Sequence, residues 1–336
     1  MKKKFTIIML LCIMAVLILD NKTALSGANN GITMCIQTVI PVLYPFLFLS
    51  VLFTSNISCI RVPFLTTIGR IMNLPANTET LWLIGLFGGY PAGAQCVSNA
   101  VEQGIISAAE GKRIMGICNN AGPSFIFGFG MHILSDLRLC FFIWSIQILS
   151  SILAGALNPK SFLSSTAQHR ATHISVSTAV KKSIHSLAII CGWVLLFRIM
   201  IELLEKWLLW IFPKEVQIFL CGILELTNGC MKLLSIHSVA LRFLFFSVFL
   251  SFGSLCVTMQ TLAISGVDIR LYLSEKLLQT LLSMLLSTIF SFFLFTDLPS
   301  AVYISVALCV TIVGIFLIIL KKKFPKKSRN KEPNVI

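Results

Sequence analysis

The sequence predicts an all-α membrane protein with about eight transmembrane helices plus two re-entrant helical hairpins. Of its 336 residues, 56% are hydrophobic and only 12% are charged, and the mean hydropathy is +0.89. Soluble domains rarely combine such values. Two further observations support this fold class: helix-breaking clusters of Gly, Pro and Asn lie inside the apolar segments, and the basic residues gather in a few zones.

Ten apolar stretches account for the predicted helices, since one span needs about 20 mostly apolar residues. The first, residues 5–19, follows three lysines and has no convincing small-residue cleavage site, so we expect a retained helix rather than a signal peptide. The other stretches lie at residues 32–55, 80–98, 113–134, 138–157, 184–204, 216–231, 237–262, 277–296 and 301–320.

The basic residues predict the orientation of the chain. The net charge of +14 arises largely from Lys2 to Lys4, from a polar linker at 158–182 and from a basic tail at 321–336. Because cytoplasmic loops of membrane proteins are enriched in Lys and Arg, we expect these zones, and with them both termini, to be cytoplasmic. The tail is expected to contact anionic lipid headgroups, and no nucleic-acid partner is expected.

This orientation limits which segments cross the bilayer. Five full crossings before residue 158 would place the linker outside, so the segment near 80–104 is expected to enter and leave on one side as a hairpin. The same argument predicts a second hairpin near 237–266, which is interrupted at Gly253 and Ser254. Four spans then lie on each side of the linker.

The linker separates two membrane halves, residues 1–157 and 183–320. A short run from Gly93 to Ser98 in the first half is similar to the run from Gly253 to Thr258 in the second. Paired interruptions at corresponding places are typical of internally duplicated transporters. We therefore predict an internal duplication, and both parallel and inverted repeats remain open.

The turn of the first hairpin is a candidate ligand site. Irregular backbone is tolerated at membrane depth only where it is buried in protein or lines a wet cavity. A helix that begins after this turn would direct unpaired N–H groups at carboxylate or phosphate oxygens. The backbone candidates are Gly88, Gly89, Tyr90, Pro91 and Gly93, and the polar side chains that follow are Gln95 and Ser98. Close packing of small residues is the structural alternative.

A second interruption lies in the Asn-rich broken helix predicted near 113–134. Gly and Pro end or open the helix there and leave carbonyls unpaired, and these carbonyls, together with amide side chains, can ligate Na⁺ or a polar solute. The alternative is hydrogen bonding between spans, worth about 0.6 kcal/mol on average. The candidate residues are Asn119, Asn120, Gly122, Pro123 and Ser124.

Glu225 is the sharpest single candidate. A charged side chain at the membrane centre costs about 2.5–3.5 kcal/mol on insertion scales, so such residues usually serve an ion, a proton or a solute. Thr227 and Asn228 follow it and complete a polar cluster. We assign Glu225 to ion coupling, with Na⁺ or H⁺ as the coupling ion and no other cofactor. The alternatives are a buried ion pair with Arg242 or Lys232, or a place at the interface.

The turn at Gly253 and Ser254 offers the counterpart of the first hairpin, with Thr258 and Gln260 on the helix that follows it. A helix N-terminus would again face the solute. No metal site is expected, because the 11 cysteines contain no Cys-x-x-Cys pair and the 5 histidines form no cluster with carboxylates.

Three of these motifs together resemble a known family. Gly-Tyr-Pro-x-Gly-Ala at 89–94, Cys-Asn-Asn-Ala-Gly-Pro at 118–123 and Leu-Glu-Leu-Thr-Asn-Gly at 224–229 are similar to motifs of the YlbJ-like sporulation integral membrane proteins. That family carries the nucleoside-recognition Gate domain and is related to the concentrative nucleoside transporters. The resemblance covers most of residues 35–300 and implies a nucleoside-transporter-like fold.

The resemblance also implies a function, the transport of a small, flat, anionic or nucleoside-like solute. The family includes a stage V sporulation protein implicated in moving dipicolinic acid across the outer forespore membrane. Dipicolinate transport during spore formation, in a bacterial cell membrane such as the outer forespore membrane, is therefore the leading expectation. The run from Gly253 to Cys256 departs from the Gly-Gly-Leu-Ser of the family pattern, which bears on the identity of the solute more than on the fold.

Two other function classes compete with transport. A sporulation membrane assembly protein could retain a transporter-like fold without moving a solute, with its basic tail docking partners or lipid. An intramembrane enzyme is not expected, because the sequence has no His-Glu-x-x-His motif and no Gly-x-Ser-x-Gly elbow. The sequence leaves the oligomeric state open, and a homo-oligomer is compatible with it.

Overall fold

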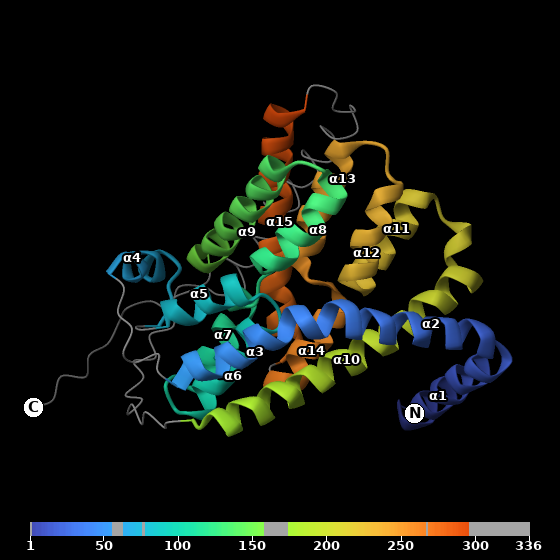
Figure 1. Ribbon diagram of the computed structural model, residues 1–336, viewed down its shortest axis with the longest axis horizontal. Helices are drawn as coiled ribbons and strands as arrows, with labels where there is room; N and C mark the ends of the chain where they lie inside the picture. The colour runs from blue at the N-terminus through green and yellow to red at the C-terminus, as the bar shows by residue number, and fades with distance from the viewer. Residues whose placement is uncertain (1, 56–62, 76–77, 158–173, 267, 296–336) are drawn as a thin grey trace, which may run out of the picture.

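The computed structural model describes residues 2–55, 63–75, 78–157, 174–266 and 268–295, and within these ranges all regular elements are helices (Figure 1). The span predicted at 301–320, the basic tail and most of the linker lie outside the described residues. Five of the described helices are long and apolar enough to cross a membrane, so the chain is a multi-pass membrane protein. They are Asn21–Thr54, Leu137–Leu157, Val176–Trp207, Val239–Ser265 and Ile269–Leu294.

The helices before the linker are mostly short and are interrupted by Gly, Pro and Asn. They are α1 (Lys2–Leu19), α2 (Asn21–Met34), a π-helical turn (Cys35–Val39), α3 (Ile40–Ser55), α4 (Pro63–Ile71), α5 (Glu79–Gly88), α6 (Ala92–Glu102), α7 (Ala108–Cys118), α8 (Pro123–Leu134) and α9 (Leu137–Leu157).

The helices after the linker begin with the longest one in the described part of the chain. They are α10 (Val176–Trp207), a 3₁₀ turn (Leu209–Ile211), α11 (Lys214–Leu224), α12 (Leu226–Lys232), a second 3₁₀ turn (Leu233–Ser235), α13 (Val239–Phe252), α14 (Ser254–Ser265) and α15 (Ile269–Leu294).

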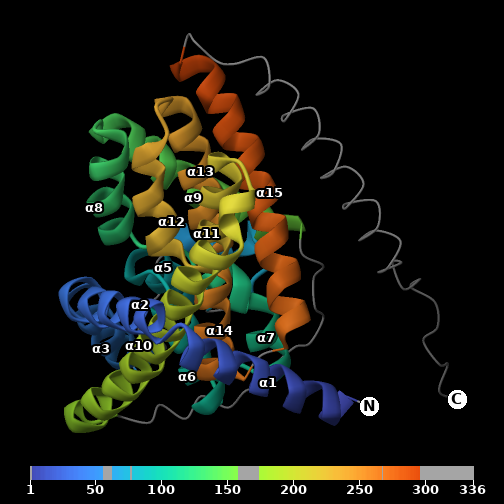
Figure 2. The ribbon, with the colours of Figure 1, turned by 90° about the vertical axis from the view of Figure 1, so that its right-hand side faces the viewer.

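Small residues allow α2 and α10 to lie side by side, as both views show (Figures 1 and 2). Gly27 and Gly31 of α2 face the backbone of α10, and a Cβ atom added at Gly27 would lie 2.8 Å from the Cα of Ile199. Glycines at a helix interface allow backbones to approach closely, which is a common packing device between membrane helices. The pair therefore forms one rigid wall of the molecule.

Asp20, between α1 and α2, joins the start of α2 to the end of α10 by hydrogen bonds. Its side chain is 7% exposed and accepts hydrogen bonds from the Lys206 ammonium at 2.8 Å and the Trp207 indole at 2.8 Å, both at the end of α10. The Thr23 hydroxyl donates a third hydrogen bond at 2.8 Å. The hydrogen bond from Lys206 is the largest cause that holds the pKa of Asp20 well below its usual range.

We expect Asp20→Asn to lower the melting temperature, because an amide cannot replace a carboxylate with cationic and indole donors. A group whose folded-state pKa is lowered contributes stability above its unfolded-state pKa, near 3.9, and loses it as the pH falls below that value. The difference in melting temperature between wild type and variant should therefore be constant from pH 7 to pH 5 and shrink at lower pH.

The matched control for Asp20 is Asp136→Asn. Asp136 pairs with Arg138 at 3.7 Å on an exposed surface, where ion pairs contribute little. Thermal unfolding of the three proteins at several pH values checks the prediction. Equal melting temperatures of wild type and Asp20→Asn at pH 7 would contradict it.

The first predicted hairpin corresponds to α5 and α6, which pack against each other around the turn at Gly89 to Pro91. Glycines again make the contact possible, because the backbone at the end of α7 lies between the two helices. Cβ atoms added at Gly85 and Gly93 would lie 1.7 and 2.1 Å from the carbonyl oxygen of Cys118, at the end of α7. The re-entry of this hairpin into the membrane stays a prediction.

The second hairpin was predicted in the wrong place. Over 237–266 the chain does not fold back: α13 and α14 follow one another in both views (Figures 1 and 2) and together make the candidate span Val239–Ser265. Gly253 and Ser254, at φ +80° and +73°, interrupt this helix without reversing it.

The helices that do reverse are α11 and α12, which pack against each other with Glu225 as the one residue between them. Their backbones touch at two glycines, since a Cβ added at Gly229 would lie 2.1 Å from the Cα of Gly222. In a helical hairpin the two helices must pack closely against each other, and the facing glycines allow that here because they have no side chains. Around Gly253 no such pair of facing glycines joins α13 to α14, both of which the structure describes in full.

The hydrophobic core is divided at the level of these interruptions. One cluster of buried side chains comes mainly from α8, α9, α12 and α13, and a second comes mainly from α5, α6 and α7. The breaks between α7 and α8 and between α13 and α14 lie where the two clusters meet. Polar and irregular backbone is thereby surrounded by protein, as its presence at membrane depth requires.

Candidate functional site

The tip of the first hairpin contacts both helix interruptions. Gly89 lies against the break after α7, because a Cβ added there would be 2.9 Å from the backbone nitrogen of Gly122. Tyr90, 7% exposed, reaches the other break: its hydroxyl donates to the carbonyl of Leu250, and its ring lies against Gly253. Gly89 thus takes part in the close packing of small residues that the sequence left as the structural alternative at this turn.

Glu225 occupies the tip of the second hairpin, where its carboxylate caps α12. One oxygen accepts the backbone N–H of Thr227 at 2.9 Å and the other accepts that of Asn228 at 2.7 Å. A carboxylate at a helix N-terminus satisfies unpaired N–H groups and interacts favourably with the helix dipole. This arrangement holds a side chain that is only 4% exposed.

Neither ion pair considered for Glu225 is present. Lys232 pairs with Glu205 at 3.0 Å. The Arg242 guanidinium donates to backbone carbonyls, including that of Ile236 at 2.6 Å. The ion pairs found among the described residues do not include Glu225. Within that part of the chain, the carboxylate is thus buried and hydrogen-bonded to backbone, with no basic side chain bound to it.

A small cavity, which we call the central cavity, is lined by residues of both hairpin tips. Its volume is about 70 Å³, and its polar lining includes Tyr90 from the first tip, Glu225 and Thr227 from the second, and Gln260 from α14. The rest of the wall comes from the π-helical turn, α3, α8, α10 and α14. Four candidate residues predicted from distant parts of the sequence therefore meet here.

Two larger hollows lie next to the central cavity. The α8 groove, of about 330 Å³, is lined by Ser124, Gly128 and His132 and shares Thr38 and Phe125 with the central cavity. It begins where the central cavity ends. The predicted candidate Ser124 belongs to this groove and not to the central cavity.

The second hollow, which we call the α6 pocket, has a volume of about 370 Å³. Its lining includes Ser186 and Ile189 of α10 and Ile264 of α14. These residues lie about one helical turn from Ile190 and Gln260, which line the central cavity. The α6 pocket therefore adjoins the central cavity along α10 and α14.

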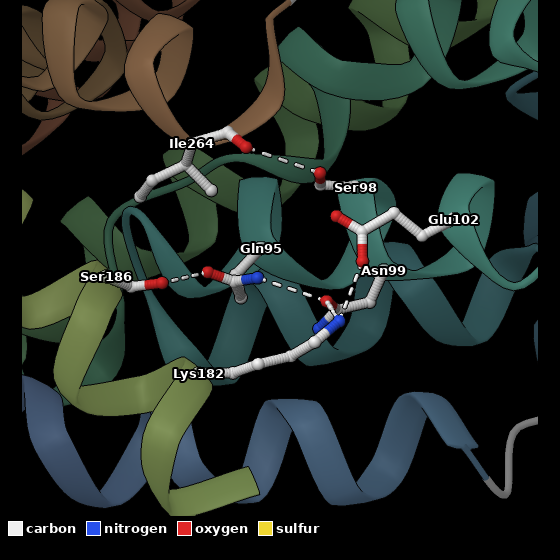
Figure 3. A network of polar contacts seen from close by, with 7 residues as sticks. All are labelled: Gln95, Ser98, Asn99, Glu102, Lys182, Ser186 and Ile264. Atoms are coloured by element: carbon white, nitrogen blue, oxygen red, sulfur yellow. Dashed lines mark hydrogen bonds and ion pairs between the residues drawn. The ribbon is translucent and has the colours of Figure 1, made fainter. Parts of the chain in front are cut away.

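A hydrogen-bonded network lines the α6 pocket (Figure 3). The Gln95 amide donates to Asn99 at 3.1 Å and accepts from the Ser186 hydroxyl. Lys182 donates to Glu102 at 2.7 Å and to Asn99 at 3.4 Å. The predicted candidate Gln95 thus lies in a polar pocket, together with cationic groups from the start of α10.

The other predicted side chains of the hairpin regions are involved in local contacts. Ser98 donates to the carbonyl of Ile264 at 3.4 Å, which joins α6 to α14. Thr258 donates to the carbonyl of Ser254 at 2.9 Å within α14. Asn228 is 4% exposed, and its amide nitrogen has no hydrogen-bond partner among the described residues. Ser98, Ser254, Thr258 and Asn228 line none of the three hollows.

Asn119 and Asn120 are completely buried and line none of the three hollows. The Asn119 amide donates to the hydroxyls of Thr261 and Tyr272, both at 2.9 Å. The Asn120 side chain accepts from the Gln279 amide at 2.7 Å. This is the interhelical hydrogen bonding that the sequence left as the alternative to solute binding.

Sequence reasoning missed the residues of α15 that hold the break after α7. Lys276 is 0% exposed, and its ammonium donates to the carbonyl of Asn119 at 2.7 Å. Glu275 accepts the backbone N–H of Gly116 at 2.9 Å. The signal was present, because a charged pair at the edge of an apolar stretch is unusual. The predicted span began at residue 277 and left the pair outside.

Comparison with known proteins yields one informative similarity. The chain is 25% identical over 307 aligned residues to the sporulation integral membrane protein YlbJ of Bacillus subtilis (strain 168), an alignment that covers 76% of this chain and 74% of the relative. No family model matches the chain, and no solved structure matches it. The long apolar helices and this similarity agree that the chain is an integral membrane protein.

Proposed function

We propose that the protein is a secondary-type membrane transporter for a small anionic or nucleoside-like solute. The observation that carries the proposal is the central cavity, in which two hairpin tips and two helix interruptions surround a buried carboxylate that has no basic partner among the described residues. Broken helices that meet around a polar site are the arrangement that transporters use for substrates and coupling ions.

The sizes of the hollows support a mechanism of alternating access. Small-molecule sites usually occupy about 300–1,000 Å³, so the central cavity of about 70 Å³ is too small for the proposed solute in this conformation. The α8 groove and the α6 pocket are each large enough. The solute would enter from one of them when a hairpin tip moves aside, and leave through the other.

The order of elements supports inverted repeats. A hairpin, a broken helix and a long helix follow one another twice, as α5–α6, α7–α8 and α9, and again as α11–α12, α13–α14 and α15. In both views α7 lies below α8, whereas α13 lies above α14, so the two broken helices run in opposite directions (Figures 1 and 2). Inverted repeats permit one half to rock against the other around a fixed site.

We assign the coupling ion as H⁺, bound by Glu225. An ionised carboxylate beside an anionic solute in a small buried site would be strongly unfavourable, because like charges repel and burial removes solvent from both. A proton on Glu225 removes that repulsion. Solute and proton would therefore move together.

Dipicolinate is the solute that we propose, transported during spore formation across the outer forespore membrane. The name of the bacterial relative, a sporulation integral membrane protein, supports the setting. The lining of the α6 pocket includes Lys181, Lys182 and His185, which can attract a dicarboxylate. Because these lysines end the basic linker, the pocket faces the cytoplasm in the orientation that we propose.

A ligand screen tests this function. We expect dipicolinate, but not nucleosides or other small dicarboxylates, to raise the melting temperature of the purified protein, since a ligand at about 100 times its Kd stabilises by about 2.7 kcal/mol. Gln260→Ala, in the central cavity, should lose the shift, and Gln217→Ala, in α11 and outside the three hollows, should keep it.

Flux measurements provide the second half of the test. Proteoliposomes that contain the wild-type protein should take up dipicolinate. If none of the solutes changes the melting temperature or enters the liposomes, the transport proposal fails, and a membrane assembly protein with a transporter-like fold takes its place.

A further inference from the structure

The break after α7 presents a set of oxygen atoms that normally attracts a cation. The last carbonyls of a helix have no partner within the helix and carry partial negative charge. At this break the carbonyls of Gly116 and Asn119 point toward one position, and the side-chain oxygen of Gln279 joins them from α15. Unpaired carbonyls of this kind, with amide oxygens beside them, can ligate Na⁺.

The position is taken by the ammonium of Lys276. Its Nζ lies 2.7 Å from the Asn119 carbonyl, 2.8 Å from the Gln279 oxygen and 3.4 Å from the Gly116 carbonyl. The two shorter distances are typical of charge-assisted hydrogen bonds. A lysine ammonium has three N–H donors, so these three oxygens can satisfy all of them.

The same ammonium connects the break to the first hairpin. Nζ lies 5.8 Å from the centroid of the Tyr90 ring, within the range of a cation–π interaction. Lys276 is 0% exposed, and the adjacent Glu275 carboxylate accepts the backbone N–H of Gly116. A side chain without N–H donors at this position would leave the three oxygens without this hydrogen-bond partner, which is costly in a buried site.

We propose that Lys276 is a tethered replacement for a free coupling cation. Two backbone carbonyls and an amide oxygen at a broken helix form a site for a small monovalent cation, and this chain fills the site with its own ammonium. Na⁺ therefore does not bind at this interruption in the wild-type protein. The inference concerns the break itself and does not depend on which solute, if any, the protein transports.

The test compares three variants of the full-length protein in detergent by thermal unfolding. The probes are NaCl, LiCl, KCl and methylammonium chloride, each compared with N-methyl-D-glucamine chloride at equal ionic strength. Lys276→Ala removes the ammonium and leaves room for an ion. Lys276→Met removes the charge but fills the space. Lys214→Ala removes an exposed lysine in the first turn of α11, outside the three hollows, and serves as the control.

We expect the melting temperature of the wild type not to change from one salt to another, and the same is expected of Lys214→Ala. Lys276→Ala should melt at a lower temperature and regain stability, saturably, with Na⁺ or methylammonium, because the free cation stabilises the folded state by mass action. Lys276→Met should also melt at a lower temperature but should not respond to any of the cations.

Several outcomes would overturn the proposal. One is that Lys276→Ala responds to none of the cations, and another is that Lys276→Met melts like the wild type, which would show that volume rather than charge holds the break. If Lys276→Ala does not fold in N-methyl-D-glucamine, the proposal expects folded protein when cells are lysed and the variant is purified in Na⁺ or methylammonium. Failure to recover it in any of the salts counts against the proposal.

Discussion

Glu225→Gln is expected to abolish proton-driven uptake while the protein remains folded. In proteoliposomes with the wild-type protein and with the membrane potential held at zero, a gradient of one pH unit should drive about tenfold accumulation of the solute if one proton accompanies each molecule, because a tenfold ratio corresponds to about 1.4 kcal/mol. The variant should show no accumulation above the outside concentration. Its side chain cannot take up and release a proton.

The fold should survive this substitution because the introduced amide would retain one of the two roles of the Glu225 carboxylate. The amide oxygen can accept one of the backbone N–H groups of Thr227 and Asn228, so the cost is that of a weakened helix cap, about 0.5–2 kcal/mol. Glu215→Gln, in the first turn of α11 and exposed to solvent, is the matched control and should transport normally. Undiminished proton-driven accumulation by Glu225→Gln would remove Glu225 from the coupling mechanism.

Gly93→Ala is expected to lower the stability of the folded protein strongly. Three helices meet at this residue, and an added Cβ would lie 2.1 Å from the carbonyl oxygen of Cys118 and 3.0 Å from the Cα of Gly85. Both neighbours are backbone and cannot rotate away. Overpacking in a core costs about 1–3 kcal/mol and occasionally more, and the total stability of most proteins is only about 5–15 kcal/mol.

The control for this substitution is Gly192→Ala, in the middle of α10, where no described atom lies within 4 Å of an added Cβ. Alanine should be neutral there or stabilise by up to about 1 kcal/mol, because glycine weakens a helix interior. Unfolding can be followed by the reaction of buried cysteines, such as Cys96 and Cys118, with a thiol-reactive dye. A Gly93→Ala protein that melts at the wild-type temperature would show that the three backbones can separate at little cost.

The two turns show which parts of the fold a local sequence pattern can predict. The turn at Gly89 to Pro91 was predicted as a reversal, and α5 and α6 do pack against each other there. The turn at Gly253 carries a similar run of small and polar residues, yet it only interrupts a helix. The difference lies in what each arm packs against, because Gly85 and Gly93 enclose the Cys118 backbone and thereby draw α5 and α6 together.

The candidate site shows the same limit. A carboxylate in an apolar segment was enough to select Glu225. A charged side chain within a membrane span is costly, and the apolar residues that define the span are its neighbours in the sequence. The amides of Asn119 and Asn120 have two uses that look identical in sequence, solute binding and hydrogen bonding between helices. For Asn119 the partners that decide between them are the hydroxyls of Thr261 and Tyr272, which are 142 and 153 positions away along the chain.

What the sequence by itself determined is that this chain belongs in a membrane and breaks its helices at a few polar points. Hydropathy and helix breaking are properties of neighbouring residues, so composition is sufficient for both. Only the tertiary structure decided that α11 and α12 form the second hairpin, that Glu225 faces the central cavity and that Lys276 fills the break after α7. These outcomes depend on contacts between helices far apart in the sequence, where backbone approach and hydrogen-bond partners are set by packing.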